Sequence, residues 1–438
     1  MTLFGTSGIR GPVGETVTAD LALSVGRALG VESERVVVGR DPRESGEFLQ
    51  AALVAGLRES GTDVVDLGLA ATPTVARAVG WRDADAGVSI TASHNPPEDN
   101  GIKLWQPSGQ AFDAPLREEI EERIAEDVFD PADWDGTGHY ETWDARERHV
   151  EAVREALDRD ALDSHVVVDV GNGAGGVTLD VLEGLGCTVE TLNAQPDGAF
   201  PGRPSEPKAE NCRSLATLVA ESDADLGVAH DGDADRMRAV AGDGTYLSGD
   251  VLLAIFARAA ADPGERVAVP VDTSLAVADY LAETDVDVEY TPVGDVYVAE
   301  AASGEGVAFG GEPSGSWIWP DRTLCPDGPL AAGTVAALDA ERSLADRAAD
   351  VPDYPIRRDS VEVAAKGTVM DAVRETVLST YDDVTTLDGV RVDLGDAWFL
   401  LRASGTQPLV RVTAEARESG RADDVFERAR ALVADARA

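Results

Sequence analysis

Short apolar runs alternate with amphipathic stretches along most of the chain. Runs such as 35–39 and 165–170 are rich in valine and have the length of buried strands. Stretches such as 18–29 and 146–157 place apolar residues at helical spacing, and Thr18 stands where its side chain can cap the first of them. The alternation of the two patterns predicts α/β units.

The same patterns predict strands and helices through the rest of the chain. Strands are predicted at 35–39, 63–67, 87–90, 165–170, 226–229, 266–271, 286–290, 307–309, 389–394, 398–402 and 409–415. Helices are predicted at 18–29, 45–60, 72–79, 116–126, 146–157, 249–260, 274–282, 327–349, 369–378 and 422–436. A stretch with four prolines, 195–207, predicts an irregular loop.

The chain of 438 residues is too long for one hydrophobic core, because a single core stops growing at about 250–300 residues. A stretch rich in Asp and Gly, 127–143, interrupts the pattern, and a short link at 351–354 precedes the last predicted unit. We therefore expect four domains. Their predicted bounds are 1–144, 145–243, 244–352 and 353–438.

The charge balance is extreme, with a formal net charge of −44. A surface this acidic repels nucleic acid and anionic lipid, so we expect neither nucleic acid nor a membrane as a partner. Apolar residues still make up 43% of the chain, so the charge indicates solvation in strong salt and predicts a halophilic archaeon as the source. Because Lys103, Lys208 and Lys366 are the only lysines, each becomes a candidate for a specific role.

Cysteine usage and hydropathy predict the compartment. Cys187, Cys212 and Cys325 are far apart, odd in number and without a CxxC pair, which argues against a disulfide framework or a zinc site. No signal peptide is visible at Met1–Arg10, and no apolar run approaches 18 residues. We expect a cytoplasmic protein.

A cluster of turn formers follows one predicted strand directly. The apolar run 86–90 leads into Thr91-Ala92-Ser93-His94-Asn95-Pro96-Pro97. Ligands bind beyond the carboxyl ends of strands in open α/β sheets. A hydroxyl beside an imidazole, on a loop stiffened by prolines, suits a nucleophile that is presented and not buried. The alternative is a polar turn that closes the strand.

Two cationic side chains stand out near this loop. The glycine-rich stretch 4–11 holds Arg10, whose guanidinium can bind a phosphate through two hydrogen bonds. A flexible terminal turn is the alternative there. Lys103 lies within ten residues of Ser93. A surface lysine is the usual alternative, but the rarity of lysine in this chain favours a functional role.

A second glycine-rich turn follows a predicted strand and opens a helix. It reads Gly171-Asn172-Gly173-Ala174-Gly175-Gly176. Its glycines match the spacing of the dinucleotide fingerprint, and Glu190 lies at about the distance of the acidic ribose ligand, ~20 residues on. A turn that serves packing alone is the alternative, and we prefer it.

Three aspartates alternate with small residues just after the strand predicted at 226–229. The sequence there is His230-Asp231-Gly232-Asp233-Ala234-Asp235-Arg236. Carboxylates that converge from one loop are ligands that Mg²⁺ prefers. Such spacing also arises by chance in an acidic chain, so the position after a strand is what favours a metal site. Arg236 adds a counter-charge for phosphate, and we expect His230 to be a packed strand-end residue.

Two further loops carry groups suited to a phosphorylated sugar. Gly311-Glu312-Pro313-Ser314-Gly315 offers a carboxylate and a hydroxyl to vicinal sugar hydroxyls. Arg402-Ala403-Ser404-Gly405-Thr406-Gln407-Pro408 offers a guanidinium, two hydroxyls and backbone N–H groups, which together suit a phosphate. Simple polar turns are the alternative at both places.

These motifs in this order resemble the α-D-phosphohexomutase family over the whole chain. The matching stretches are 4–11, 91–96, 231–236, 311–315 and 402–408. The resemblance implies three related α/β domains with mixed sheets and a smaller C-terminal α+β domain around a central active-site cleft. It also implies an isomerase, an intramolecular phosphotransferase that interconverts hexose 1-phosphates and hexose 6-phosphates.

The resemblance further implies residue roles. Ser93 carries a phosphoryl group and passes it to the substrate, so that hexose 1,6-bisphosphate is both intermediate and activator. The implied ligands of Mg²⁺ are Ser93, Asp231, Asp233 and Asp235. The implied cations at the reacting phosphate are Arg10, Lys103 and Arg236, with Lys103 or His94 as proton carrier. The implied substrate-binding residues are Glu312, Ser314, Arg236, Arg402, Ser404, Gly405 and Thr406.

The chain departs from the family pattern at a few positions. Ala234 stands where a second glycine is common, Gln407 where glutamate is common, and Ser316 where a histidine often follows the sugar loop. These departures leave the proton carrier and the choice of sugar open. Chain length and the sugar loop favour the phosphoglucosamine mutase branch, with phosphoglucomutase/phosphomannomutase as the alternative.

Two other classes are open at this point. One is a Mg²⁺-dependent sugar phosphatase that uses the same serine, and the other is a non-catalytic protein that binds sugar phosphates. Separate sugar and phosphate loops favour a mutase, because a phosphatase needs neither. Ser93, the aspartates and Lys103 argue against a binding protein. A small sugar phosphate is the expected partner, and the chain is expected to act as a monomer or homodimer.

Overall fold

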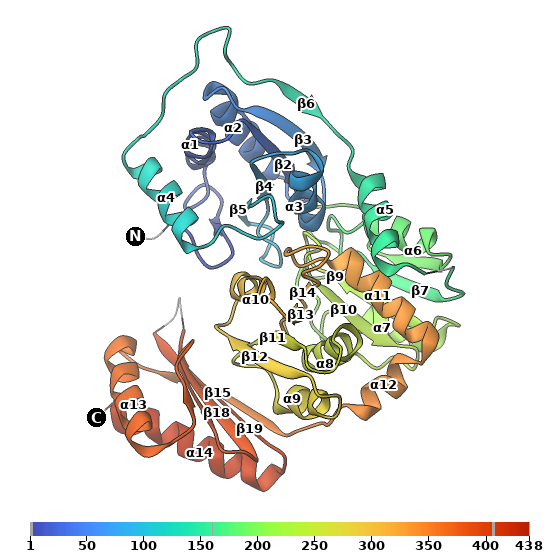
Figure 1. Ribbon diagram of the computed structural model, residues 1–438, viewed down its shortest axis with the longest axis vertical. Helices are drawn as coiled ribbons and strands as arrows, with labels where there is room; N and C mark the ends of the chain where they lie inside the picture. Colours follow the sequence, from blue (N-terminus) through green and yellow to red (C-terminus); the bar gives the residue numbers. More distant parts are fainter. Residues whose placement is uncertain (1–2, 160, 405–407, 438) are drawn as a thin grey trace. The chain divides into compact units, whose positions relative to one another are not determined.

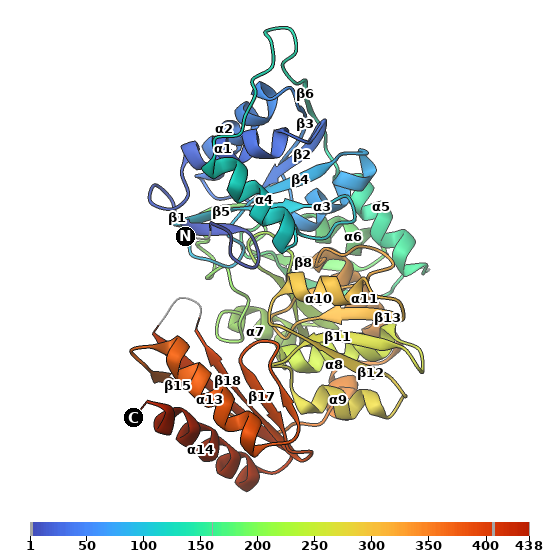
Figure 2. The ribbon, with the colours of Figure 1, turned by 60° about the vertical axis from the view of Figure 1, so that its left-hand side comes forward.

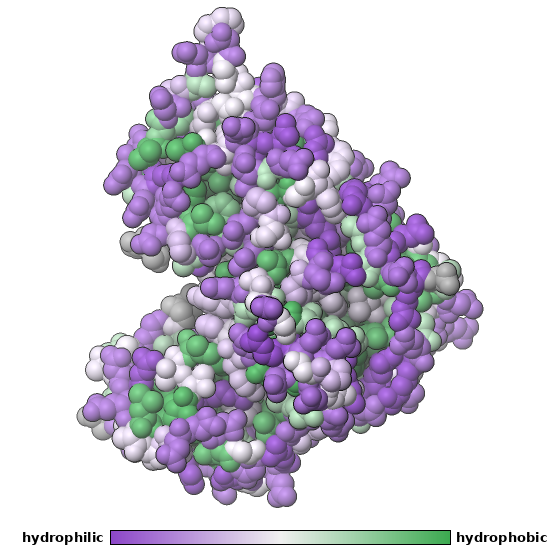
Figure 3. Space-filling view, in the orientation of Figure 1, coloured by the Kyte–Doolittle hydropathy of each residue, from purple (hydrophilic) through white to green (hydrophobic). Residues whose placement is uncertain are grey.

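The computed structural model describes residues 3–159, 161–404 and 408–437. The chain forms two compact units, which Figure 1 and Figure 2 show as ribbons. The first unit contains residues 1–252 and 314–348, and the second contains residues 253–313 and 349–438. Hydrophilic residues cover most of the face drawn in Figure 3. Among the described residues, no helix is both long and apolar enough to cross a membrane.

The first unit contains these elements. Its strands are β1 (Ile9–Pro12), β2 (Arg35–Arg40), β3 (Asp63–Leu69), β4 (Ala86–Ile90), β5 (Asp99–Trp105), β6 (Tyr140–Thr142), β7 (His165–Asp169), β8 (Thr188–Leu192), β9 (Leu226–His230), β10 (Met237–Ala241) and β14 (Trp317–Ile318). Its helices are α1 (Ala19–Gly30), α2 (Gly46–Glu59), α3 (Thr72–Trp81), α4 (Ala114–Ala125), α5 (Arg146–Leu157), α6 (Val177–Gly184), α7 (Arg213–Glu221) and α11 (Gly328–Glu341).

The second unit contains the remaining elements. Its strands are β11 (Arg266–Pro270), β12 (Asp287–Thr291), β13 (Val307–Gly311), β15 (Ile356–Glu362), β16 (Val384–Thr385), β17 (Val390–Asp393), β18 (Ala397–Ala403) and β19 (Leu409–Ala416). Its helices are α9 (Leu275–Ala282), α10 (Asp295–Ala302), α13 (Lys366–Thr380) and α14 (Ser419–Ala436). The chain passes from one unit to the other within α8 (Gly249–Ala260), between Pro313 and Ser314, and within α12 (Leu344–Asp350).

The first sheet is mixed and has the strand order β1-β5-β4-β2-β3-β6. β2 pairs in parallel with β3 and β4, whereas β5 runs antiparallel to both β4 and β1. Alternate residues of β2 enter different cores, since Val36 and Val38 pack with α1 and α2 while Val37 packs with α3. The parallel strands bring the loops after β2, β3 and β4 to the same edge, where Ser93 lies.

The second sheet has the order β10-β9-β7-β8. β7 pairs in parallel with β8 and β9, and β9 turns back through residues 231–236 to pair antiparallel with β10. Leu215 and Val219 of α7 pack on Val167 and Val240 of this sheet. The predicted metal loop is therefore a tight connection between two buried antiparallel strands.

The second unit contains one parallel and one antiparallel arrangement. β11 pairs in parallel with β12 and with β13. The C-terminal sheet, in the order β15-β19-β18-β17-β16, is antiparallel, and α13 and α14 share a valine-rich core with it. These arrangements confirm the predicted fold class. Each sheet falls within one predicted domain, whose bounds stay predictions.

The single helix predicted at 327–349 is wrong, because the chain breaks between α11 and α12. Arg342 is extended, with φ −159°. Ser343 Oγ accepts a hydrogen bond from the Asp346 N–H, and Asp339 Oδ1 accepts one from the Leu344 N–H. These local side-chain acceptors satisfy the first backbone donors of α12 and so start a new helix.

The sequence criteria also missed several short elements. They are β1, β5, β6, β8, β10, β14, β15, β16, α7 and α10. β5 shows why, because it opens with Asp99-Asn100-Gly101, residues typical of a turn. Its pairing with β4 on one side and β1 on the other, which comes from distant parts of the chain, makes it a strand.

Candidate active site

Ser93 lies three residues beyond the end of β4, on the loop that the sequence predicted. Its backbone has φ +52°, a left-handed conformation that is uncommon for any residue with a side chain. The Ser93 N–H donates to Thr91 Oγ1 at 2.8 Å, and the Thr91 hydroxyl donates to Asp41 Oδ2 at 2.7 Å. These two bonds help to hold the unusual turn.

The Ser93 hydroxyl is directed toward the aspartate loop. Its Oγ donates to Asp231 Oδ2 at 2.6 Å and lies 3.2 Å from His94 Nδ1. Ser93 is only 1% exposed. The expectation of a presented, unburied hydroxyl is therefore wrong, because a buried carboxylate orients this side chain.

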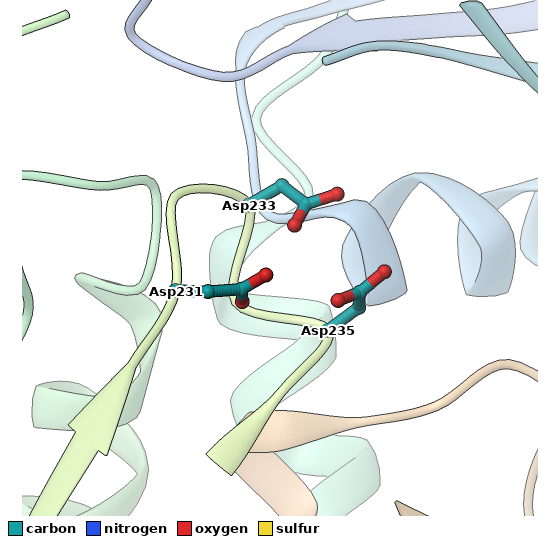
Figure 4. Close-up of side chains that lie close together, drawn as sticks. All are labelled: Asp231, Asp233 and Asp235. Atoms are coloured by element: carbon teal, nitrogen blue, oxygen red, sulfur yellow. The ribbon is translucent and has the colours of Figure 1, made fainter. Parts of the chain in front are cut away.

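The loop between β9 and β10 brings three buried carboxylates together. Asp231, Asp233 and Asp235 each offer an oxygen within 4.8 Å of the others. Figure 4 shows the three side chains close together on this loop. Within the described part of the chain, the buried Asp233 Oδ1 has no hydrogen-bond partner. A buried carboxylate oxygen without a donor is costly unless a cation binds it. The oxygen donor set therefore fits Mg²⁺.

The charges within this loop shift the pKa values of its aspartates in opposite directions. Burial, together with the neighbouring charges of Asp233 and Asp235, raises the pKa of Asp231 well above its usual value. Burial also opposes ionisation of Asp233, but the Lys103 ammonium outweighs it and lowers the pKa of Asp233. Two neighbouring aspartates of one loop therefore differ in their tendency to ionise, with Asp233 the more acidic.

Lys103, on β5, is the cation at the centre of the cluster. Its Nζ donates to Asp233 Oδ2 at 2.8 Å and to Asp235 Oδ2 at 2.5 Å, and its side chain is 3% exposed. Thr72, at the start of α3, donates through Oγ1 to the same oxygen of Asp233 at 2.7 Å. Residues of β5 and α3 thus contact carboxylates of the loop between β9 and β10, which joins the first sheet region to the second.

Arg10, His94 and Arg236 surround the same cluster with cationic and imidazole groups. Burial, followed by the charges of Arg236, Arg10 and Lys103, lowers the pKa of His94 to about 2. His94 is therefore neutral at physiological pH. Arg10 Nε is buried and has no hydrogen-bond partner among the residues that the structure describes.

The glycine-rich turn 171–176 supports the aspartate loop through close packing. The Ala174 N–H donates to Gly232 O at 2.9 Å. A Cβ at Gly173 would lie 2.7 Å from Gly232 O, so only glycine allows this approach. Packing therefore explains Gly173, which agrees with the packing role that we preferred for this turn.

His230 is a packed strand-end residue, as the sequence predicted. It is fully buried, and its ring nitrogens contact Thr178 Oγ1 at 2.9 Å and Arg236 O at 2.9 Å. Burial lowers the pKa of His230 to about 4. Its contacts hold the two ends of the aspartate loop together.

The candidate residues for sugar and phosphate lie on other parts of the chain. In the second unit, the buried Glu312 accepts a hydrogen bond from the Gly294 N–H at 2.8 Å, and Arg402 donates to Asp388 Oδ2 at 2.8 Å. Ser404 O accepts from Lys366 Nζ. Ser314 belongs to the first unit. Gly405 and Thr406 lie outside the described residues.

Sequence analysis missed several residues that hold the site. They are Asp41, Arg43, Thr72, Arg203 and Ser205. A signal existed for three of them, because Asp41 directly follows β2, Arg43 lies three residues beyond β2, and Thr72 lies three residues beyond β3. Parallel strands place those positions at the same edge as Ser93.

Comparisons with known proteins agree with this geometry. Four domain descriptions of one family match the chain: phosphoglucomutase/phosphomannomutase alpha/beta/alpha domain I at residues 1–130, domain II at 147–244, domain III at 248–354, and the C-terminal domain at 357–432. Together they cover most of the chain.

Whole-length relatives point the same way. The chain is 45% identical to a probable phosphoglucosamine mutase of Methanococcoides burtonii over 440 residues, which is 100% of both proteins. It is 46% identical to one of Methanopyrus kandleri over 433 residues, 96% of this chain and 95% of the relative. An X-ray structure of a phosphoglucomutase/phosphomannomutase family protein from Burkholderia thailandensis superposes with a TM-score of 0.89 at 29% identity, covering 99% of this chain and 97% of that one. The chain belongs to the phosphoglucomutase/phosphomannomutase family, and it is a phosphohexomutase.

Proposed function

We propose that this phosphohexomutase interconverts glucosamine 1-phosphate and glucosamine 6-phosphate. The observation that carries the reaction type is the Ser93 hydroxyl, 2.6 Å from Asp231 within a buried carboxylate cluster. The names of the two archaeal relatives, which are similar over nearly their whole length, support glucosamine phosphate as the substrate. Phosphoglucomutase/phosphomannomutase activity is the alternative, and these relatives do not favour it.

The proposed reaction uses two phosphoryl transfers. The Ser93 Oγ–P bond breaks, a bond forms between phosphorus and the free hydroxyl of the substrate, and the hydroxyl proton passes to a base. The resulting hexose 1,6-bisphosphate turns over. Its other sugar O–P bond then breaks, phosphorus bonds to Ser93 Oγ, and the released sugar oxygen takes up a proton. The enzyme is regenerated and the isomer leaves. Added hexose 1,6-bisphosphate phosphorylates any Ser93 that has lost its group, which makes it an activator.

The aspartate loop is the proposed magnesium site. Asp231, Asp233, Asp235 and an oxygen on Ser93 would hold the ion. Bound Mg²⁺ neutralises negative charge on a transferring phosphoryl group. Lys103 holds Asp233 and Asp235 in place and adds a positive charge beside Ser93.

The remaining charges around Ser93 fit the reacting phosphate and its proton. Arg10 has a buried Nε donor without a partner among the described residues, which suits a phosphate oxygen. Arg236 adds a second guanidinium. His94 is a candidate proton carrier by position, since its Nδ1 lies 3.2 Å from Ser93 Oγ. Burial and its cationic neighbours lower its pKa to about 2, which makes the imidazole a weak base while those charges stand unopposed. Lys103 is the other candidate proton carrier.

The sugar and the non-reacting phosphate are assigned to the other loops. We propose that Glu312 and Ser314 bind sugar hydroxyls in either orientation of the intermediate. The Gly294 N–H orients Glu312, and Asp388 orients the guanidinium of Arg402. The residues proposed to bind the distal phosphate are Arg402, Ser404, Gly405 and Thr406.

A substrate panel tests this function. The 1-phosphates of glucosamine, glucose and mannose are converted separately in high salt, with Mg²⁺ and a trace of the matching bisphosphate. We expect the highest kcat/KM with glucosamine 1-phosphate and no activity in Ser93→Ala. Release of inorganic phosphate without isomerisation would indicate a phosphatase instead. A higher kcat/KM with glucose or mannose phosphate would contradict the proposed substrate.

Location and assembly are part of the same proposal. We expect the enzyme to work in the cytoplasm as a monomer or homodimer, without nucleic acid or membrane. Sedimentation in high salt checks the assembly state, and a species larger than a dimer would contradict it.

A further inference from the structure

The buried Arg43 side chain forms hydrogen bonds with several backbone carbonyls of the Ser93 loop. Its guanidinium donates to four carbonyl oxygens of that loop, at 2.5–2.9 Å, and its Nε donates to Asp41 Oδ2 at 2.9 Å. The four carbonyls belong to Ser93, Asn95, Pro96 and Asp99. Since a guanidinium has five N–H groups, every donor of the 0% exposed Arg43 side chain is used.

Asp41 connects this arginine to the turn at Ser93. Its Oδ2 accepts from Arg43 Nε and from the Thr91 hydroxyl, which in turn accepts the Ser93 N–H. Arg43 therefore binds the Ser93 carbonyl directly, and Asp41 is linked to the Ser93 N–H through the Thr91 hydroxyl. These are the two peptide groups whose orientation defines the left-handed conformation of Ser93.

A second contact ties the Ser93 carbonyl to the segment that supports the aspartate loop. Ser205 Oγ donates to Ser93 O at 2.9 Å. A Cβ at Gly232 would lie 2.7 Å from the same carbonyl and 2.8 Å from Ser205 Oγ, so the two loops are in close contact. Arg43 also stacks on the ring of Phe200, with Cζ 5.0 Å from the centroid.

Arg203 fixes the other side of this junction. Its Nε pairs with Asp169 Oδ2 at 2.7 Å, and its Nη2 donates to His230 O at 2.6 Å, immediately before Asp231. It also donates to the carbonyls of Pro204 and Ser205. One arginine thus holds the loop of Ser93, a second holds the loop of Asp231, and Ser205 joins them.

We propose that Arg43 is a positioning residue for phosphoryl transfer, and that Ser205 couples it to the aspartate loop. Arg43 holds Ser93 in its left-handed conformation so that Oγ faces Asp231. This inference rests on the proposed function, since it assigns these residues to the Ser93 reaction. The donors of Arg43 and the hydroxyl of Ser205 are used on protein groups, so loss of either side chain should lower kcat more than it changes KM.

Arg43→Lys is the first test, because lysine keeps the charge beside Asp41 but has only three donors on one nitrogen. We expect kcat to fall about 100-fold with KM for the sugar phosphate within about twofold. Ser205→Ala removes one of the two hydrogen bonds to Ser93 O, and we expect kcat to fall about 3- to 10-fold.

Arg77→Lys is the matched control, since Arg77 is also a buried arginine paired with an aspartate. We expect it to lower the unfolding midpoint and leave kcat unchanged.

Hydrogen exchange gives a readout independent of turnover. Amides of residues 91–99 should exchange faster in Arg43→Lys and Ser205→Ala than in the wild type, but not in Arg77→Lys. Unchanged kcat in both test variants, or an equal loss in Arg77→Lys, would overturn the inference. If the two variants exchange faster but the wild-type protein isomerises no hexose phosphate, the proposed function is refuted and the structural role of Arg43 stands.

Discussion

The chemistry at Ser93 depends on how a few buried charges balance. Three carboxylates lie within 4.8 Å of one another, and the Lys103 ammonium contacts two of them. Burial alone would favour the neutral acid at each position, as it does at Asp231. Lys103 keeps Asp233 ionised, and an ionised carboxylate is the form that binds a metal ion. We therefore expect Lys103 to contribute to stability and to catalysis.

We predict that Lys103→Gln lowers kcat/KM by about 100-fold or more, because it removes a cation beside the reacting group and a candidate proton carrier. We also expect a loss of about 3–5 kcal/mol in the free energy of unfolding, because the buried Asp233 and Asp235 lose their ion-pair partner. Steady-state kinetics and denaturant unfolding measure the two effects.

Lys208→Gln is the matched control. Lys208 pairs with Glu206 at the surface, where its side chain is 53% exposed. An exposed pair contributes little to stability, so we expect a change within about 1 kcal/mol and unaltered kinetics. Equal effects of the two substitutions would contradict the role given to Lys103.

Sequence reasoning identified the candidate residues that are close together in the chain, and the structure brings them into contact. The three aspartates stand within one short loop, and Ser93 with His94 forms another, so their types and spacing identify them. Arg43, Thr72 and Ser205 were missed because their contacts join residues between 50 and 161 positions apart. The only local signal for Arg43 and Thr72 is their position after β2 and β3, and the fold decides which distant residues they contact.

At the scale of elements, a buried ion pair connects three helices of the first unit. Asp327 caps α11 by accepting the Leu330 N–H at 2.9 Å, and its Oδ2 pairs with Arg77 of α3 at 2.6 Å. The same oxygen lies 3.2 Å from Nε2 of His149 on α5. Burial opposes ionisation of Asp327, but Arg77 and His149 outweigh it and lower its pKa. The carboxylate therefore stabilises the packing of these helices.

We predict that Asp327→Asn lowers the free energy of unfolding by about 3–5 kcal/mol near pH 7, because Arg77 is left buried without its counter-ion. The folded-state pKa of Asp327 is below its unfolded value of about 3.9, so its contribution is complete above that pH and is lost as the pH falls further. Unfolding of the variant should therefore depend less on pH below about 4.

Asp396→Asn provides the control for this measurement. Asp396 pairs with Arg421 at the surface. We expect its loss to change stability by about 1 kcal/mol or less. If both variants kept the acid sensitivity of the wild type, Asp327 would not be a source of that sensitivity.

Element prediction succeeded where strands and helices carry their own pattern. β7 and α5 were placed within a residue of their bounds, since valine runs and helical spacing are local properties. β5 was missed because its first residues are typical of a turn, and α11 was extended too far because the side-chain contacts of Ser343 and Asp339 interrupt an otherwise helical stretch. Strand pairing made β5 a strand, and side-chain acceptors at the start of α12 separated it from α11.

For the whole molecule, the net charge of −44 is the dominant physical property. Repulsion among so many carboxylates opposes the compact state, and salt reduces it because the Debye length falls from about 10 Å at 0.1 M to about 3 Å at 1 M. The hydrophobic cores of the described sheets are nevertheless well formed. The fold should therefore depend on salt.

We predict that the midpoint of thermal unfolding rises steadily from 0.1 M to 2 M KCl. Circular dichroism at each salt concentration measures it. Sucrose at matched osmolality is the control, because it is excluded from the protein surface but screens no charge. A midpoint that is independent of KCl, or that rises equally in sucrose, would contradict the prediction of a halophilic protein.

The central claim is that Ser93 carries the phosphoryl group, and single-turnover transfer tests it most directly. The protein is labelled with ³²P-hexose 1,6-bisphosphate, freed of ligand and mixed with glucosamine 6-phosphate and Mg²⁺ in high salt. We predict that the label lies on the peptide containing Ser93, moves to the sugar as the bisphosphate, and is absent from Ser93→Ala. Label on another residue, or retained mutase activity in Ser93→Ala, would contradict the account.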